Sequence, residues 1–93
     1  MHVKIYLRPD CPYSRRALQL LHDKRADVEC VDVSQDPAFH DEMEALSRRD
    51  AVPQVFIGHR HVGGLDDLLA LDTSGELDVL LYVGTPHDLT TSA

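Results

Sequence analysis

The chain has 93 residues and a formal net charge of −7, which fits a single domain and argues against general nucleic-acid binding. No period of roughly 20 to 50 residues repeats, and no apolar run approaches the roughly 18 residues of a membrane-spanning helix. Two cysteines are too few for a disulfide-built secreted domain, and the N-terminus lacks the apolar stretch of a secretory signal. We expect a cytoplasmic monomer that contacts neither nucleic acid nor membrane.

Charge is unevenly distributed along the chain. Residues 1–25 contain six Lys or Arg and two Asp, a net charge of +4. Residues 26–93 contain three Arg and fourteen Asp or Glu, a net charge of −11. A basic N-terminal quarter in an acidic protein predicts a local anion site in that quarter.

The first half of the chain predicts two strands and two helices in alternation. Residues 2–7 alternate polar and apolar side chains, as a strand does, and residues 27–33 do so again. Between them, Pro12 at a first helical position predicts a helix to about residue 24, with Cys11 as its N-cap. Asp36-Pro37 caps the second helix, which ends near residues 48–49; its apolar face is expected to be Phe39, Met43 and Leu46.

The second half predicts a hairpin followed by helices. Residues 52–57 form a strand entered through a proline, residues 58–60 turn, and residues 61–62 return. Leucines at helical spacing follow a glycine pair, and a short last helix spans residues 76–82. The resulting order predicts an α/β fold with a four-stranded mixed sheet and helices on both faces. Residues 85–93 are polar and are expected to be a disordered tail after a domain of residues 1–84.

Cys11 is the residue with the strongest chemical signal. A cysteine at a helix N-cap faces unpaired backbone N–H groups and the positive end of the helix dipole, which favour the thiolate. Arginines at positions 8, 15 and 16 would add positive potential. The thiolate is the nucleophilic form of cysteine, so this setting favours a reactive residue over an inert buried one.

Three motifs in order resemble the glutaredoxin family, and the likeness covers roughly residues 3–83. Cys11-Pro12-Tyr13-Ser14 is similar to the active-site motif of that family, usually Cys-Pro-Tyr-Cys. Residues 52–57 resemble the family's strand after its cis-proline, and residues 63–68 its glycine-pair glutathione motif. The region after the glycine pair looks most like the small bacterial glutaredoxin 3 type. The resemblance implies a thioredoxin-like fold, with glutathione as co-substrate. No metal is expected, because no third ligand accompanies His59 and His61.

The resemblance also assigns the glutathione contacts. Val52 would pair through its backbone with the cysteinyl unit, next to a cis bond to Pro53; without the resemblance, a trans bond would be favoured. Asp67 would bind the γ-glutamyl ammonium, although Asp66 and Asp67 also suit a helix N-terminus as plain charges. Arg49 is an alternative to Arg8 for the glycyl carboxylate, or else a solvated charge. The full set is Arg8, Cys11, Tyr13, Val52, Pro53, Gly64, Leu65, Asp66 and Asp67.

Ser14 is where the chain departs from the dithiol pattern. It stands where dithiol members have a resolving cysteine, as in a natural monothiol member or an engineered replacement. Cys30 is expected to be a small buried residue in mid-strand, with a second redox role as the alternative. His59 and His61 are expected to be structural or solvated rather than metal ligands.

The expected function is that of a glutathione-dependent thiol–disulfide oxidoreductase, an enzyme that reduces glutathionylated proteins or small disulfides through Cys11 alone. The alternative is a redox sensor or an iron–sulfur carrier, in which two chains share a cluster through two Cys11 and two glutathiones. Cluster-carrying members more often have Gly-Phe where this chain has Pro12-Tyr13, which favours the enzyme.

Overall fold

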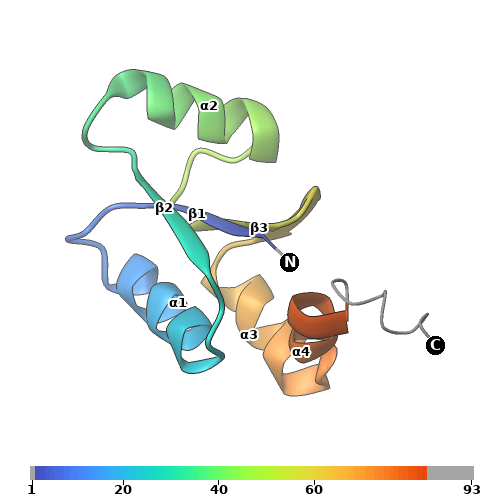
Figure 1. Ribbon diagram of the computed structural model, residues 1–93. Coiled ribbons are helices and arrows are strands. Elements are labelled where there is room, and N and C mark those ends of the chain that lie inside the picture. The colour runs from blue at the N-terminus through green and yellow to red at the C-terminus, as the bar shows by residue number, and fades with distance from the viewer. Residues whose placement is uncertain (1, 84–93) are drawn as a thin grey trace.

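The computed structural model describes residues 2–83, in which a sheet lies between two layers of helices (Figure 1). Its elements are β1 (Val3–Leu7), α1 (Pro12–Asp23), β2 (Val28–Asp32), α2 (Pro37–Ser47), β3 (Gln54–Ile57), β4 (Arg60–Gly63), α3 (Leu65–Ser74), α4 (Glu76–Asp78) and the π-helical η1 (Val79–Val83). The expected four-stranded mixed sheet with helices on both faces is confirmed. The expected tail of residues 85–93 lies outside the described residues.

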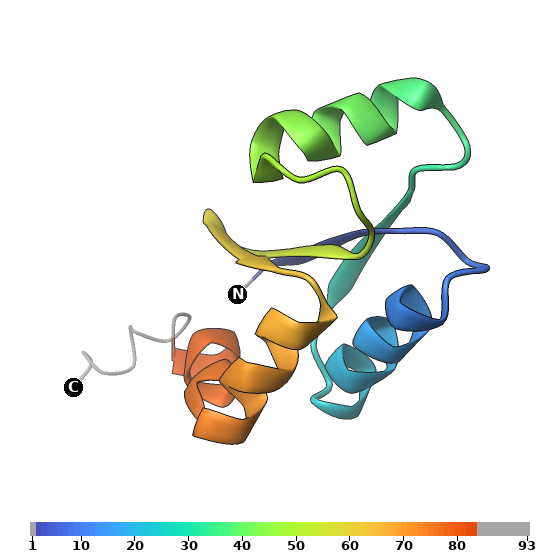
Figure 2. The same ribbon diagram turned by 180° about the vertical axis from the view of Figure 1, so that it is seen from behind.

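The sheet has the order β2-β1-β3-β4, which places β1 in its interior. β1 runs parallel to β2 and antiparallel to β3, and β3 pairs antiparallel with β4. α1, α3 and α4 cover one face of the sheet, and α2 covers the other face (Figure 2). None of the helices between residues 2 and 83 has the length and apolar character needed to span a bilayer.

The alternation of β1 side chains builds a core on each face. Val3, Ile5 and Leu7 belong to the larger cluster, which also contains residues of α1, α3 and α4. Tyr6 points to the other face and packs with Val33 and Met43 in a small cluster under α2. The loop from β1 into α1 leaves the sheet at the end of this buried strand, so Cys11 is attached to a rigid support.

The contact face of α2 differs from the expected one. Met43 is fully buried, but Phe39 and Leu46 remain 37% and 57% exposed, whereas Ser47 is buried. Successive helix residues are about 100° apart, so His40 and Ser47 flank Met43 on the side opposite to Phe39 and Leu46. The helix turns that polar side inward, and the burial of Ser47 is compensated because its hydroxyl donates to the Met43 carbonyl at 2.7 Å and accepts from the Arg49 N–H at 3.0 Å.

Cys30 was expected to be buried, and this prediction is wrong: its side chain is exposed. It pairs with the buried Ile5, but β2 is an edge strand and α1 does not cover that edge fully. Cys30 lines a mainly apolar cavity of about 270 Å³ together with Arg15 and Leu18 of α1. Partial burial there raises the pKa of the Cys30 thiol.

The expected strand over residues 52–57 begins later, at Gln54. The Val52–Pro53 peptide bond is cis, as the family resemblance implied, and these two residues stand outside the ladder of β3. The short strand expected over residues 61–62 is longer, spanning Arg60 to Gly63. The strand entrance thereby becomes a bend that faces α3.

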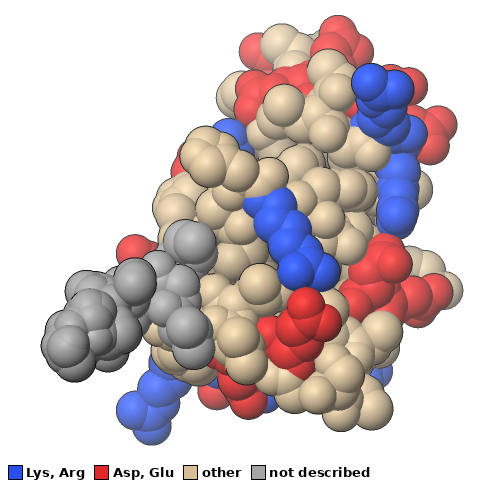
Figure 3. Space-filling view, turned by 90° about the vertical axis from the view of Figure 1, so that its right-hand side faces the viewer, with Lys and Arg blue, Asp and Glu red and all other residues tan. Residues whose placement is uncertain are grey.

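The separation of charge along the sequence does not persist in the fold. Lys24 pairs with Asp72 and Asp78 at 2.7 and 2.9 Å, and Lys4 donates to Glu42 at 3.3 Å. Basic and acidic side chains likewise lie next to one another on the face shown in Figure 3. Both lysines of the basic N-terminal quarter are therefore paired with acids from later in the chain, and an anion site there has to rest on arginines or on backbone N–H groups.

Candidate active site

Cys11 lies at the start of α1, where its sulfur faces the first turn of the helix. It has extended backbone angles, φ −90° and ψ 120°, and Pro12 follows as the first helical residue. Its N–H donates to the Arg8 carbonyl at 3.1 Å, and its carbonyl accepts from Arg15 N–H at 3.0 Å. The expected N-cap position is confirmed, and the side chain is half-buried.

The surroundings of Cys11 favour its thiolate. Partial burial raises the pKa of the thiol, but a hydrogen bond from the Ser14 hydroxyl and the N–H groups of Ser14 and Tyr13 outweigh it. The pKa of Cys11 therefore lies below its ordinary value, although the Asp10 carboxylate opposes this shift. Hydrogen bonds at the helix start, rather than the neighbouring arginines, are the largest of the lowering effects.

Ser14→Ala is expected to move the pKa of Cys11 up toward its ordinary value, because the hydroxyl donor to the thiolate is lost. The pH dependence of thiolate ultraviolet absorbance, and of alkylation by iodoacetamide, should shift to higher pH. Ser74→Ala, at an exposed site on α3, is the control and should leave both curves in place. A titration of Cys11 unchanged by Ser14→Ala would contradict this role of Ser14.

A pocket of about 340 Å³ lies next to this helix start, within the size range of small-molecule sites. It is formed by the start of α1, the loop from α2 into β3, the first residue of β3 and the start of α3. Its lining residues are Tyr13, Arg49, Ala51, Val52, Pro53, Gln54, Gly64, Leu65, Asp66 and Asp67. Seven of the ten residues assigned to the site from sequence are in this set.

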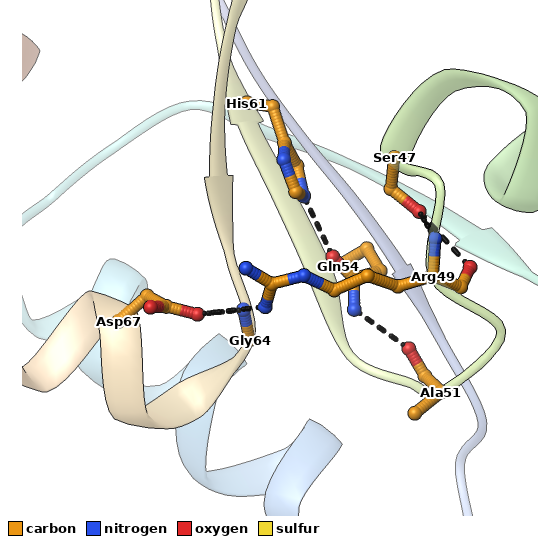
Figure 4. Close-up of polar contacts among 7 residues, drawn as sticks. All are labelled: Ser47, Arg49, Ala51, Gln54, His61, Gly64 and Asp67. Carbon is orange, nitrogen blue, oxygen red and sulfur yellow. Dashed lines mark hydrogen bonds and ion pairs between the residues drawn. The ribbon is translucent and has the colours of Figure 1, made fainter.

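Asp67 and Arg49 form an ion pair at this pocket (Figure 4). Arg49 Nη1 lies 2.9 Å from Asp67 Oδ2, and the same oxygen accepts from the Gly64 N–H at 3.0 Å. These two donors hold the pKa of the Asp67 carboxyl below its usual range, so it is an anion at neutral pH. Asp67 is thus both a helix cap and a charged group that a bound cation can contact.

The α3 N-terminus approaches the cis-proline closely. A Cβ atom on Gly64 would lie 3.3 Å from the Pro53 carbonyl oxygen, which is tighter than an ordinary contact. Gly64 therefore lets the first turn of α3, with the N–H groups of Leu65 and Asp66, lie beside the bend at Pro53. Unpaired N–H groups at a helix start are a general anion-binding feature.

Three of the residues assigned from sequence do not line the pocket. Ser14 is buried, and its hydroxyl accepts from Arg8 N–H at 3.3 Å. Cys11 lies two residues before Tyr13, which borders the pocket. The Arg8 side chain is exposed and lines a different cavity of about 420 Å³, next to the start of α2. Arg49 is the arginine that the structure places at the pocket.

Gln54 lines the pocket, but the sequence interpretation missed it. A glutamine in the expected strand is not by itself a chemical signal. Its position directly after the expected cis-proline is the signal that could have indicated a role at the site. His61, expected to be structural or solvated, hydrogen-bonds to Gln54 at 2.7 Å. Within residues 2–83, no group of three or more His, Cys, Asp or Glu side chains is arranged to hold a metal ion.

A low-pKa cysteine at the start of the first helix and a cis-proline at the entrance of the third strand define a thioredoxin-like thiol oxidoreductase. Comparison with known proteins identifies the family within this class. The sequence pattern of the Glutaredoxin family matches residues 3–62, about two thirds of the chain. The chain belongs to the glutaredoxin family, whose members are thiol–disulfide oxidoreductases that use glutathione as co-substrate.

Individual relatives match nearly the whole domain. Glutaredoxin 3 of Escherichia coli K12 is 44% identical over 80 residues, covering 86% of this chain and 96% of the relative. Glutaredoxin of Pseudomonas aeruginosa is 43% identical over 79 residues, covering 85% and 94%. The solution structure of glutaredoxin from Brucella melitensis superimposes with a TM-score of 0.80 at 48% identity, covering 91% of this chain and 92% of that one.

Proposed function

We propose that this protein reduces mixed disulfides between proteins and glutathione through Cys11 alone. The observation that carries the proposal is the low-pKa thiol next to a pocket with three charged features: the α3 N-terminus, the Asp67 carboxylate and the Arg49 guanidinium. Glutathione has two carboxylates and one ammonium group, so its charges are complementary to these features. Membership in the glutaredoxin family supports the same co-substrate.

In the proposed complex, glutathione extends along the bend before β3. The backbone of Val52 pairs with the cysteinyl unit, as an added strand does. The N–H groups of Leu65 and Asp66 hold the γ-glutamyl carboxylate, and Asp67 holds the ammonium. Arg49 leaves its ion pair with Asp67 and holds the glycyl carboxylate instead. Arg8, which is exposed beside the Cys11 loop, stays a second predicted contact for the same carboxylate.

The proposed reaction has two exchange steps. The Cys11 thiolate attacks the glutathione sulfur of the substrate, the substrate S–S bond breaks, and the substrate thiolate leaves and takes up a proton. Cys11 then carries glutathione as a mixed disulfide. The thiolate of a second glutathione attacks the glutathione sulfur of this adduct, which releases oxidised glutathione and the Cys11 thiolate. Two electrons pass to the substrate, and no second protein cysteine is needed.

Ser14 makes the adduct step directly testable, because a serine cannot form a disulfide with Cys11. In a Cys30→Ser background, which removes the exposed second thiol, oxidised glutathione should add one glutathione to Cys11. Free glutathione should remove it. A Ser14→Cys variant should instead eject the glutathione and close an internal disulfide between positions 11 and 14.

Intact-mass spectrometry under native conditions distinguishes these products. Failure of Cys11 to take up glutathione, or failure of glutathione to release it, would contradict the proposal. An internal Cys11–Cys30 disulfide in the unmodified chain, formed without denaturant, would also contradict it. Anaerobic purification with glutathione tests the iron–sulfur alternative: a brown dimer favours the carrier, and a colourless monomer favours the enzyme. Location in the cytoplasm and the monomeric state stay predictions.

A further inference from the structure

Gln54 is a polar side chain that is buried at the pocket, only 2% exposed. Both ends of its amide are bonded: Nε2 donates to the Ala51 carbonyl at 2.8 Å, and Oε1 lies 2.7 Å from Nε2 of His61 (Figure 4). The three residues form a continuous chain from β4 through β3 to the loop before the cis-proline. None of the steps proposed above uses Gln54 or His61.

The direction of every hydrogen bond in this chain is determined by chemistry. A backbone carbonyl only accepts, so the amide nitrogen of Gln54 must face Ala51, and the amide oxygen must face His61. His61 therefore donates from Nε2. An imidazole with a proton on Nε2 does this whether it is neutral or protonated, so titration of His61 does not break the chain.

His61 is held in place by its other contacts. It is half-buried on β4, and its ring lies 5.0 Å from the ring of Phe56, between centroids, with the planes tilted by 40°. β4 pairs with β3 in the sheet. The donor to Gln54 is thus mounted on the sheet, whereas the far end of the chain lies on a loop outside it.

The contact at the Ala51 carbonyl also affects Val52, because the peptide unit that joins the two residues is planar. The Ala51 carbonyl and the Val52 N–H belong to one peptide plane, so a bond that orients the carbonyl also orients the N–H. Val52 is half-buried against the small cluster under α2, but Ala51 is exposed, so side-chain packing supports this plane at one end only. Val52 is also the residue whose backbone is proposed to pair with glutathione.

We propose that Gln54 and His61 are positioning residues that orient the Ala51–Val52 peptide for binding of the glutathione part of the substrate. This inference rests on the proposed function, because the hydrogen-bonded series His61–Gln54–Ala51 would serve the proposed pairing of the Val52 backbone with glutathione. Neither residue takes part in the thiol exchange itself. Their loss should therefore affect substrate binding and leave the reaction at Cys11 in the saturated enzyme intact.

Four substitutions test the chain from both ends. Gln54→Leu removes both hydrogen bonds, and Gln54→Glu keeps an acceptor for His61 but loses the donor to Ala51. His61→Leu leaves the Gln54 oxygen unpaired, whereas His61→Gln restores an N–H donor. His59→Leu, at an exposed position on the same hairpin, and Gln19→Leu, at an exposed position on α1, are the matched controls.

With the mixed disulfide of glutathione and cysteine as substrate, KM should rise about tenfold in Gln54→Leu, Gln54→Glu and His61→Leu. Their kcat should stay within about twofold of the unmodified protein, and the pKa of Cys11 should not move. His61→Gln should recover most of the loss, and both controls should behave as the unmodified protein. In nitrogen–proton correlation spectra without ligand, the Val52 amide signal should move in Gln54→Leu and stay in His59→Leu.

The possible failures are distinguishable. If the unmodified protein neither takes up glutathione on Cys11 nor turns over the substrate, the proposed function is wrong. If it does both, but Gln54→Leu and His61→Leu keep their KM, or lose kcat instead, the positioning role is overturned. Circular dichroism shows whether each variant is folded. Where a Gln54 variant does not fold, the comparison of His61→Leu with His61→Gln tests the positioning role.

Discussion

Cys11→Ser is expected to lower the rate of glutathione–disulfide exchange by more than about a thousandfold, because it removes the nucleophile itself. A serine hydroxyl at this site has no accessible ionised form near neutral pH, and it forms no disulfide with glutathione. Release of a thiol from a glutathionylated peptide, followed with glutathione present, measures the loss. The folded structure should be retained, because a serine oxygen at this N-cap can accept from the same N–H groups of Tyr13 and Ser14 that face the Cys11 sulfur.

Cys30→Ser is the matched control and should keep most of the activity. Accessibility alone would not select Cys11 as the nucleophile, because Cys30 is the more exposed of the two thiols. Their ionisation does: hydrogen bonds at the α1 start lower the pKa of Cys11, whereas partial burial raises that of Cys30. Equal inactivity of a folded Cys30→Ser variant would show that the two roles have been assigned wrongly.

The sequence predicted those parts of the fold that depend on short-range signals. Alternation in β1, the Cys11-Pro12 start of α1 and the Asp36-Pro37 start of α2 all lie where they were expected. Each depends on a few neighbouring residues: a strand period, a cap or a fixed proline φ. The three family motifs then placed the pocket, because they fall at the helix start, the bend and the α3 N-terminus that surround it.

Other features depend on packing between distant segments, and the sequence could not supply them. The burial of Cys30 depended on whether β2 is an edge strand and on how far α1 extends over it. The face of α2 depended on Ser47, a polar residue whose burial is compensated by bonds to its own helix and to Arg49. The role of Gln54 depends on His61 and Ala51, which only the fold places on either side of its amide.

Gly63 and Gly75 offer a comparison in which the same substitution has very different consequences. Both have positive φ, 118° and 84°, where an alanine is strained. A Cβ on Gly75 would meet nothing within 4 Å, whereas a Cβ on Gly63 would lie 2.2 Å from Asp67 Oδ2 and 2.7 Å from its Cγ. The Asp67 carboxylate must then move, and it loses its contacts with Arg49 and with the Gly64 N–H.

Gly75→Ala should therefore cost about 1 kcal/mol of unfolding free energy, from backbone strain alone. Gly63→Ala should cost about 3 kcal/mol, because the loss of the α3 cap and the steric clash add to the strain. Urea unfolding followed by circular dichroism gives both values. For a small domain the larger loss is a substantial part of the total stability.

The same pair also tests the charged end of the pocket. Under conditions where both variants stay folded, Gly63→Ala should bind S-methylglutathione at least about tenfold more weakly, because Asp67 no longer faces the ammonium group. Gly75→Ala should bind it as the unmodified protein does, because Gly75 lies at the opposite end of α3. Equal losses of stability in the two variants would show that the Asp67 carboxylate moves aside at little cost. Unchanged binding in Gly63→Ala would then remove Asp67 from the glutathione site, because its displaced carboxylate would have proved dispensable.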